Sequence, residues 1–293
     1  MGPERRHERG LLGPQSVAWS VIGHPGSLVG GLRALMIQSL HPLAMAGVAQ
    51  HSDYRMRALD RLRRTAYYVT ATVFGDLATA RAAAERVRTI HRRVRGFDPV
   101  TGRAYSADDP DTQVWVHSVE WHSFLAAYRA FAPTLAASEE DCYISEGVAI
   151  AELVGTPREL VPHSVAAMHA YFEGVRSELR VSSDSRDAID FVLHPPLTRE
   201  LLAVQVPLRI FSNAALALVP RDLRRLADVD RPRALDVVAL AAARPLVGSM
   251  VLPGVRDVAA LVLGGEVRRV REQALGAYGQ ATPASLGRER AAA

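Results

Sequence analysis

The strongest candidate for chemistry in this sequence is His91, which lies in a helical pattern predicted from about Asp76 to Arg95. The apolar residues Val87, Ile90 and Val94 are expected to define the inner face of this helix. His91 follows Val87 by four positions and precedes Val94 by three, so we expect its side chain to point inward with them. A buried imidazole needs a partner for its nitrogens. Two interpretations remain open from spacing alone: a core histidine bound to a carbonyl, or an axial ligand to iron.

A second candidate group is formed by Arg61, Arg64 and Thr65, which lie at helical spacing and therefore share one face. Two neighbouring guanidinium groups repel each other unless a negative group lies between them. There are two kinds of candidate for this negative group. One is a carboxylate of the protein such as Asp60 or Asp53, and the other is an anionic group of a cofactor, a substrate or a reduced-oxygen species. Spacing alone favours a solvated or salt-bridged surface group.

The other histidines form no recognisable metal motif. His117 and His122 are five residues apart, which is not the spacing of two ligands on one helix turn. A two-histidine site that joins His91 to His117 has no support from spacing. The sequence also contains no serine nucleophile elbow, no phosphate-binding loop and no glycine-rich dinucleotide motif.

Composition excludes several further classes of site. All 35 basic residues are arginine, so neither a Schiff-base lysine nor a lysine general base is available. The net charge is only +4 and the arginines do not gather into one segment, so we expect no nucleic-acid partner. The single cysteine, Cys142, excludes an internal disulfide and a thiolate-rich zinc or iron–sulfur site.

Helical periodicity extends over most of the 293 residues. The first predicted helix begins at Leu28 and is interrupted at Pro42, because proline removes a backbone donor and restricts His41 before it. Residues 97–110 are rich in turn formers and are predicted to form a loop. The other predicted helices cover Asp53–Phe74, Asp76–Arg95, Thr112–Phe131, Ser138–Val154 and, approximately, residues 162–180, 184–193, 199–217, 221–228 and 233–247.

Strand signals are almost missing, and the predicted fold is therefore all-α, a multi-helix bundle. We expect an irregular N-terminal arm over residues 1–27, one helical domain over 28–275 and a frayed tail over 276–293. The N-terminus lacks the pattern of a signal peptide, which favours a cytoplasmic protein. The apolar stretches Leu201–Val219 and Ala234–Leu252 are broken by arginine and proline, so they predict no membrane span but leave peripheral membrane contact open.

Several short segments, in this order and spacing, resemble one family. The similarity extends over roughly residues 15 to 260. Its segments are Arg33-x4-Gln38-x2-His41-Pro42, Ala46-Gly47-Val48, His51-Ser52, Arg61-x2-Arg64-Thr65, Phe74-Gly75, His91-x2-Val94-x-Gly96, Tyr105-Ser106-Ala107-x-Asp109-Pro110 and Trp115-Val116-His117. The family is that of the MpaB oxygenases, also known as the catalytic domain of latex-clearing rubber oxygenases.

The resemblance implies a helical fold with a globin-like core and a b-type haem. It assigns the proximal iron ligand to His91 and the distal side to Arg61, Arg64 and Thr65, where the rubber-cleaving relatives carry Arg, Lys and Thr. The replacement of the relatives' lysine by Arg64 matters, because guanidinium stays protonated and has no lone pair for iron. A resting state in which this side chain coordinates the iron is therefore excluded. The resemblance consequently does not imply cleavage of the same substrate.

The function implied is that of a haem b-dependent oxygenase that acts with dioxygen on an unsaturated apolar substrate, isoprenoid-like or lipid-like. In this hypothesis His91 holds the iron, while Thr65 and Arg61 orient bound oxygen and Arg64 adds positive potential. Two alternatives stay open: a non-enzymatic haem sensor or carrier, and a helical scaffold without cofactor. The sequence does not predict the oligomeric state.

Overall fold

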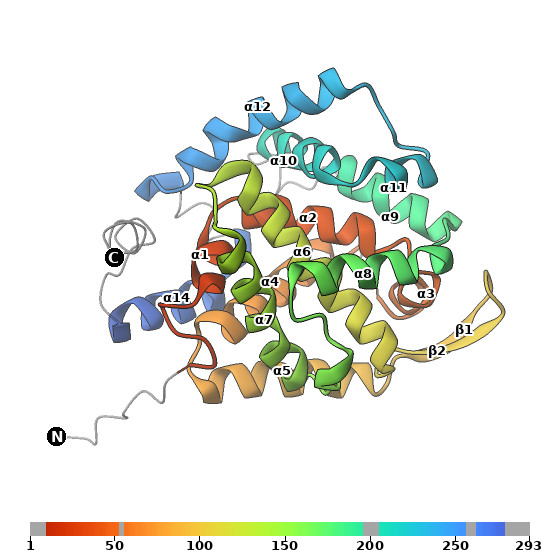
Figure 1. The fold of residues 1–293 in the computed structure, drawn as a ribbon, viewed down its shortest axis with the longest axis horizontal. Helices are drawn as coiled ribbons and strands as arrows, with labels where there is room; N and C mark the ends of the chain where they lie inside the picture. Colours follow the sequence, from red (N-terminus) through yellow and green to blue (C-terminus); the bar gives the residue numbers. More distant parts are fainter. Residues whose placement is uncertain (1–9, 53–55, 196–204, 256–261, 279–293) are drawn as a thin grey trace.

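The computed structural model describes residues 10–52, 56–195, 205–255 and 262–278, and it is helical almost throughout (Figure 1). In the N-terminal half the elements are α1 (Val17–Gly23), α2 (Ser27–Gln38), α3 (Pro42–His51), α4 (Ala58–Phe74), α5 (Leu77–His91), β1 (Arg95–Asp98), β2 (Arg103–Ser106) and α6 (Pro110–Phe131). They continue with α7 (Ala137–Leu153), η1 (Arg158–Leu160), α8 (Val165–Val175), η2 (Arg176–Glu178), α9 (Ser183–Leu193), α10 (Gln205–Leu218), α11 (Arg221–Leu226), α12 (Arg233–Ser249) and α14 (Gly265–Tyr278). The prediction of an all-α, multi-helix fold is confirmed, whereas the globin-like character of its core stays a prediction.

Helix α6 lies between two hydrophobic cores. One side of α6 contributes Trp115 and Val119 to a core shared with α2, α10 and α12. The other side contributes Trp121 and Phe124 to a core shared with α1, α4, α7 and α14. More than half of the residues of α6 are buried between these two cores, polar ones included.

Helices α2 and α6 approach closely because α2 carries a glycine where they meet. A Cβ on Gly30 would lie 2.9 Å from the carbonyl oxygen of Ser123 and 3.0 Å from the Cα of Phe124. Only glycine permits this distance between the two backbones. Helix α10 packs on α2, and α12 packs on α10, so that α12 is the outermost helix on this side (Figure 1).

The expectation of an irregular arm over residues 1–27 is wrong for Val17–Gly23, which form α1. The Ser16 hydroxyl caps this helix by accepting the N–H of Trp19. The indole N–H of Trp19 donates to the carbonyl of Val73 at 2.8 Å and so ties α1 to the end of α4. Glycine and proline on both sides of this short helix obscured its periodicity in the sequence.

The predicted loop over residues 97–110 is also wrong, because residues 95–106 form an antiparallel hairpin. Its turn is closed by Asp98, whose carboxylate accepts the backbone N–H groups of Val100 and Thr101. Gly102 takes a left-handed conformation with φ of 68°. Each strand has only four residues and lacks apolar alternation, so no strand pattern was visible.

The break at Pro42 is confirmed: α2 ends at Gln38, and His41 caps α3 through its side chain. The expected start of the frayed tail at Gly276 is wrong, since α14 runs to Tyr278 with Val267, Val270 and Ala274 buried. The expected helix starts at Asp53 and at residue 199, the arm up to residue 9 and the tail from 279 lie outside the described residues.

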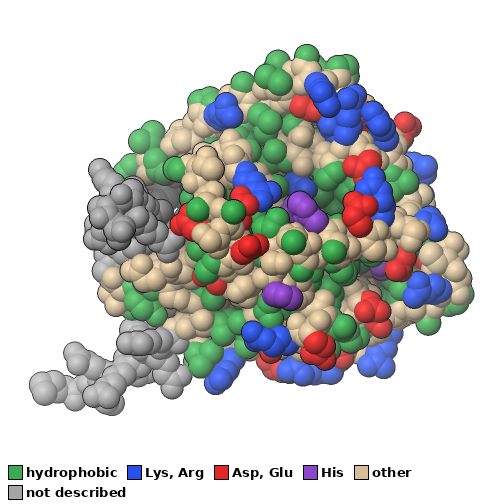
Figure 2. All heavy atoms as spheres, in the orientation of Figure 1, with side chains coloured by type: hydrophobic (Ala, Val, Ile, Leu, Met, Phe, Trp, Pro, Cys, Tyr) green, Lys and Arg blue, Asp and Glu red, His purple; other side chains and the backbone are tan. Residues whose placement is uncertain are grey.

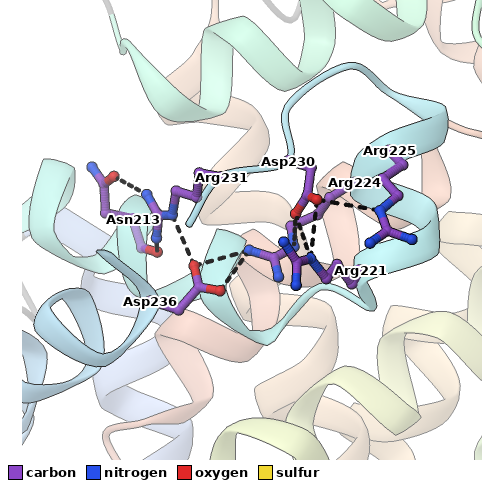
Figure 3. Close-up of polar contacts among 7 residues, drawn as sticks. All are labelled: Asn213, Arg221, Arg224, Arg225, Asp230, Arg231 and Asp236. Atoms are coloured by element: carbon purple, nitrogen blue, oxygen red, sulfur yellow. Dashed lines mark hydrogen bonds and ion pairs between the residues drawn. The ribbon is translucent and has the colours of Figure 1, made fainter. Parts of the chain in front are cut away.

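A network of arginines and carboxylates joins α10, α11 and α12 (Figure 3). Buried Arg224 donates from Nη1 to both carboxylate oxygens of Asp236, at 2.9 and 2.8 Å. Arg231 donates to the same carboxylate at 2.8 Å and also binds Asn213 on α10. Charge-assisted bonds of this kind fix the position of α12 against the inner helices.

Candidate functional site

His91 is the last residue of α5, and its side chain is half-buried as the sequence predicts. The inner face of α5 runs through Ala80, Ala84 and Val87 to His91, at spacings of three or four residues. Ile90, which was expected on this face, is 47% exposed. It lies about 100° round the helix axis from His91, and therefore points outward.

The imidazole of His91 lacks the partner that a core histidine normally has. Its Nδ1 atom is buried and has no hydrogen-bond partner among the described residues. Burial lowers the pKa of His91, and the charge of Asp108 opposes this only in part. The ring is therefore neutral at physiological pH, with a lone pair available for a metal or a proton donor.

The β-hairpin that follows His91 is fastened to the end of α3. His51 Nε2 lies 3.1 Å from the carbonyl oxygen of Arg95. Gln50 donates to the carbonyl of Phe97 at 3.0 Å and accepts a 2.8 Å hydrogen bond from the Tyr105 hydroxyl. These contacts hold the chain just after His91 in a fixed position against α3.

Position 96 has no room for a side chain. A Cβ at this position would lie 2.5 Å from the hydroxyl oxygen of Tyr105 and 2.8 Å from Oε1 of Gln50. The motif that contains His51 is far in the chain from those that contain His91, Gly96 and Tyr105. The structure brings them together at one end of α3.

Arg61 joins this neighbourhood from α4. Its Nη1 donates a 3.0 Å hydrogen bond to the hydroxyl of Ser52, the residue after α3. Arg61 is half-buried, whereas Arg64 and Thr65 are exposed. Arg64 Nε donates to the carbonyl of Asp60 within its own helix at 3.3 Å. Of the three predicted distal residues, the structure therefore joins only Arg61 to the elements around His91.

Another part of the motif series serves helix packing between α2 and α6. Gln38 donates to the carbonyl of Val116 at 2.9 Å, and the indole of Trp115 donates to the carbonyl of Gln38. Arg33 is buried and donates to the carbonyl of Leu218 and to the Ser123 hydroxyl. Burial lowers the pKa of Arg33 to about 9, so it remains charged at neutral pH.

Glu120 is a titratable residue that the sequence reasoning missed. It lies in the middle of α6, and burial raises the pKa of its carboxyl to about 7. Burial raises the pKa of Tyr68 on α4 and that of Tyr143 on α7, and the charge of Glu120 adds to both shifts, so the carboxyl lies near both hydroxyls. The sequence feature that could have indicated this residue is its isolation, because Glu120 is the only acidic residue between Asp111 and the end of α6.

His117, one turn before Glu120, is buried and stacks on Trp121 with ring centroids 5.5 Å apart. Burial lowers its pKa to about 4, and the ring is neutral. On α4, Tyr68 lies three residues after Thr65 and seven after Arg61, on the same side of the helix. The face that carries the predicted distal residues therefore continues toward Glu120 on α6.

A separate hollow of about 230 Å³ lies at the start of α3, between the hairpin and η2. It is lined by His41, Pro42, Leu43, Thr101, Arg103, Ser177, Glu178 and Arg180. His91 is not among these residues. The hollow is also smaller than the roughly 300 Å³ at which pockets for organic cofactors begin.

Within the described ranges, no three His, Cys, Asp or Glu side chains gather closely enough to hold a metal ion by themselves. None of the described helices combines the length and the apolar character needed to cross a membrane.

Comparison with known proteins identifies a family. A family model described as ER-bound oxygenase mpaB/B'/Rubber oxygenase, catalytic domain, matches residues 19–249. Comparison with curated proteins and with solved structures gives no significant match. The matched range begins in α1, ends with α12, and contains His91, Arg61 and all the motif segments described above.

Proposed function

The chain belongs to the family of the ER-bound oxygenase mpaB/B' and rubber oxygenase catalytic domains, and we propose that it is a haem b-dependent oxygenase. Its substrates are dioxygen and an unsaturated apolar molecule, isoprenoid-like or lipid-like. The observation that carries this proposal is the buried Nδ1 of His91, which has no partner among the described residues. A buried polar atom without a partner is costly unless a bound group satisfies it.

His91 would hold the haem iron as the one protein ligand on its side. A neutral imidazole is a common ligand of haem iron, and burial keeps this imidazole neutral. The porphyrin itself provides four ligands, so a cluster of several metal-binding side chains is not required. No Cys-x-x-Cys-His attachment sequence exists in the chain, and the haem is therefore non-covalent.

The hydrogen bonds from α3 to the hairpin give His91 its support. Gln50 and His51 hold the backbone at Phe97 and Arg95, and so restrain the chain that follows the end of α5. A ligand held in one orientation loses less conformational entropy on binding. When bound, the haem would supply the activation of dioxygen that no amino-acid side chain provides.

The proposed distal residues act through charge and hydrogen bonding. Arg61 is held by Ser52 and presents a permanent positive charge. Thr65 offers a hydroxyl and Arg64 a second guanidinium, and both are accessible to a ligand because they are exposed. Such donors stabilise negative charge that develops on oxygen. In double-bond cleavage, one oxygen atom of dioxygen would enter each of the two carbonyl groups formed, so that no external reductant is consumed.

An absorption spectrum of protein expressed with ample haem and iron tests the cofactor. We expect a Soret band that is removed by acid–butanone extraction. A colourless protein that also takes up no added haemin contradicts the proposal. Single-turnover reaction of the reduced protein with oxygen and an alkene then separates an oxygenase from a haem carrier.

A further inference from the structure

The outer face of α12 is an unusual surface, because almost every exposed position on it is apolar. From Ala234 to Val255 the exposed residues are Ala234, Leu235, Val237, Val238, Ala241, Ala242, Arg244, Pro245, Gly248, Val251, Leu252, Pro253, Gly254 and Val255. Val237 is 67% exposed and Val251 65% exposed. Single exposed apolar residues are ordinary, but a continuous row of them marks an interaction surface. We call this row, including the turn up to Val255, the α12 outer face.

The α12 outer face takes no part in packing α12 against the rest of the protein. The core-facing residues of α12 lie on the opposite side: Ala243 and Val247 belong to the core, and Leu240 and Leu246 pack against it. Figure 1 shows α12 at the edge of the molecule, with α10 between it and the remaining helices. The apolar side chains of the α12 outer face therefore contribute nothing to the described core.

Basic side chains outnumber acidic ones among the exposed charges around this face. Arg233 and Arg244 are its exposed charged residues, and the one acid of the segment, Asp236, is buried in the network of Figure 3. At the corner between α11 and α12, Arg225 is exposed beside the exposed Asp228, while Arg221 is paired with Asp230 (Figure 3). Figure 2 shows arginines gathered beside hydrophobic side chains at the upper edge of the molecule.

We propose that the α12 outer face docks flat on an anionic lipid bilayer. An apolar helix face flanked by arginine is the pattern of helices that lie in the membrane interface. Leu235, Val237 and Val238 would enter the boundary of the acyl chains, while Arg233 and Arg244 contact lipid phosphates. Neither haem nor the site at His91 takes part in this contact, and membrane binding is therefore independent of the proposed function.

A second copy of the chain fits this face less well. In a symmetric dimer the same patch occupies both sides of the interface. Two copies of the α12 outer face would bring arginines together without an exposed acid of the segment to pair with them. An anionic bilayer complements the face better, because it offers negative headgroups to Arg233 and Arg244 and an apolar layer to the exposed valines and leucines.

Vesicle flotation of the full chain tests the proposal. We expect binding to vesicles of equal parts phosphatidylcholine and phosphatidylglycerol, and much weaker binding to phosphatidylcholine alone. The double variant Val237→Glu, Val238→Glu should reduce partition into the anionic vesicles by roughly tenfold or more. Val100→Glu is the matched control, because Val100 is 48% exposed at the hairpin turn, and it should leave partition unchanged.

A second double variant, Arg233→Gln with Arg244→Gln, should weaken binding to anionic vesicles roughly tenfold and leave binding to phosphatidylcholine unaltered. Circular dichroism and sedimentation velocity of each variant establish that it is folded and report its oligomeric state. Absence of binding by the wild type, or equal loss in the Val100→Glu control, overturns the proposal. So does a wild-type dimer that the Val237→Glu, Val238→Glu variant converts to monomer.

Discussion

Arg61 on α4 donates a 3.0 Å hydrogen bond to the Ser52 hydroxyl, which joins α4 to the residue that follows α3. Arg64, three residues later on the same helix, is exposed and donates to a carbonyl of its own helix. The two arginines of one motif therefore have different surroundings. Arg61 is held in place by a neighbouring element, while Arg64 can move toward a ligand.

This difference leads to a prediction for Arg64→Lys. An arginine at this position cannot coordinate iron, so the resting iron should keep an open or water-filled distal position and bind cyanide readily. A lysine that becomes desolvated near iron can lose its proton and coordinate. We expect Arg64→Lys to become six-coordinate at high pH and to bind cyanide more slowly, as read by resonance Raman spectroscopy.

Arg81→Lys, at an exposed position early in α5, is the control and should behave as wild type. A wild-type iron that already has a nitrogen ligand on its distal side contradicts the prediction. In that case another side chain occupies the position assigned to oxygen.

His91 illustrates which part of the site could be predicted from the sequence. Its inward direction follows from the spacing to Val87, and the structure confirms it. Glu120 could not be identified from the sequence, because a single acid within a helix produces no recognisable spacing. Its raised pKa arises from burial by other helices, which is a property of the tertiary structure. Periodicity predicts which side of its helix a residue occupies, but it does not predict which other helix that side chain contacts.

The errors in the predicted fold have a similar origin. Helix α1 depends on the hydrogen bond from Trp19 to Val73, and the hairpin depends on Gln50 and His51 from α3. These contacts join residues that are more than forty positions apart. Short elements obtain most of their stability from such tertiary contacts, so their local sequence carries a weak signal.

Replacement of the proposed iron ligand gives a second prediction. His91→Ala should reduce the haem content of purified protein by roughly tenfold or more, because metal binding depends strongly on the ligand. Its helicity by circular dichroism should change little, since the His91 ring makes no hydrogen bond through Nδ1 in the described structure. His117→Ala serves as the control and should retain haem. Wild-type haem content in His91→Ala would mean that the proximal ligand lies elsewhere, with His117 as the next candidate.

Glu120 predicts a pH dependence of stability. Burial raises the pKa of this carboxyl from 4.5 to about 7 in the folded protein. Between these two values the folded state keeps the proton while the unfolded chain loses it, so stability falls as pH rises through this window. Above pH 7 the full penalty is present, and below 4.5 it vanishes.

Glu120→Gln removes this titration while keeping a similar shape. The variant should exceed the wild type in free energy of unfolding by about 1–2 kcal/mol at pH 8, a value reduced for partial exposure, and by little at pH 4. Urea denaturation at both pH values measures the difference. If the gap between variant and wild type does not change with pH, Glu120 is not buried as a neutral acid.

The network in Figure 3 gives the last prediction, which concerns stability alone. Asp236 accepts from buried Arg224 and from Arg231, so Asp236→Asn leaves two guanidinium groups without their carboxylate. Loss of one partner from a buried ion pair typically costs about 3–5 kcal/mol. Asp222→Asn is the control: it breaks the pair with Arg176 on the surface, where the cost should stay below about 1 kcal/mol. Urea denaturation followed by circular dichroism compares the two variants. Equal losses would show that the Arg224–Asp236 pair is as well screened by water as a surface pair, and that α12 is held on α10 by its apolar contacts alone.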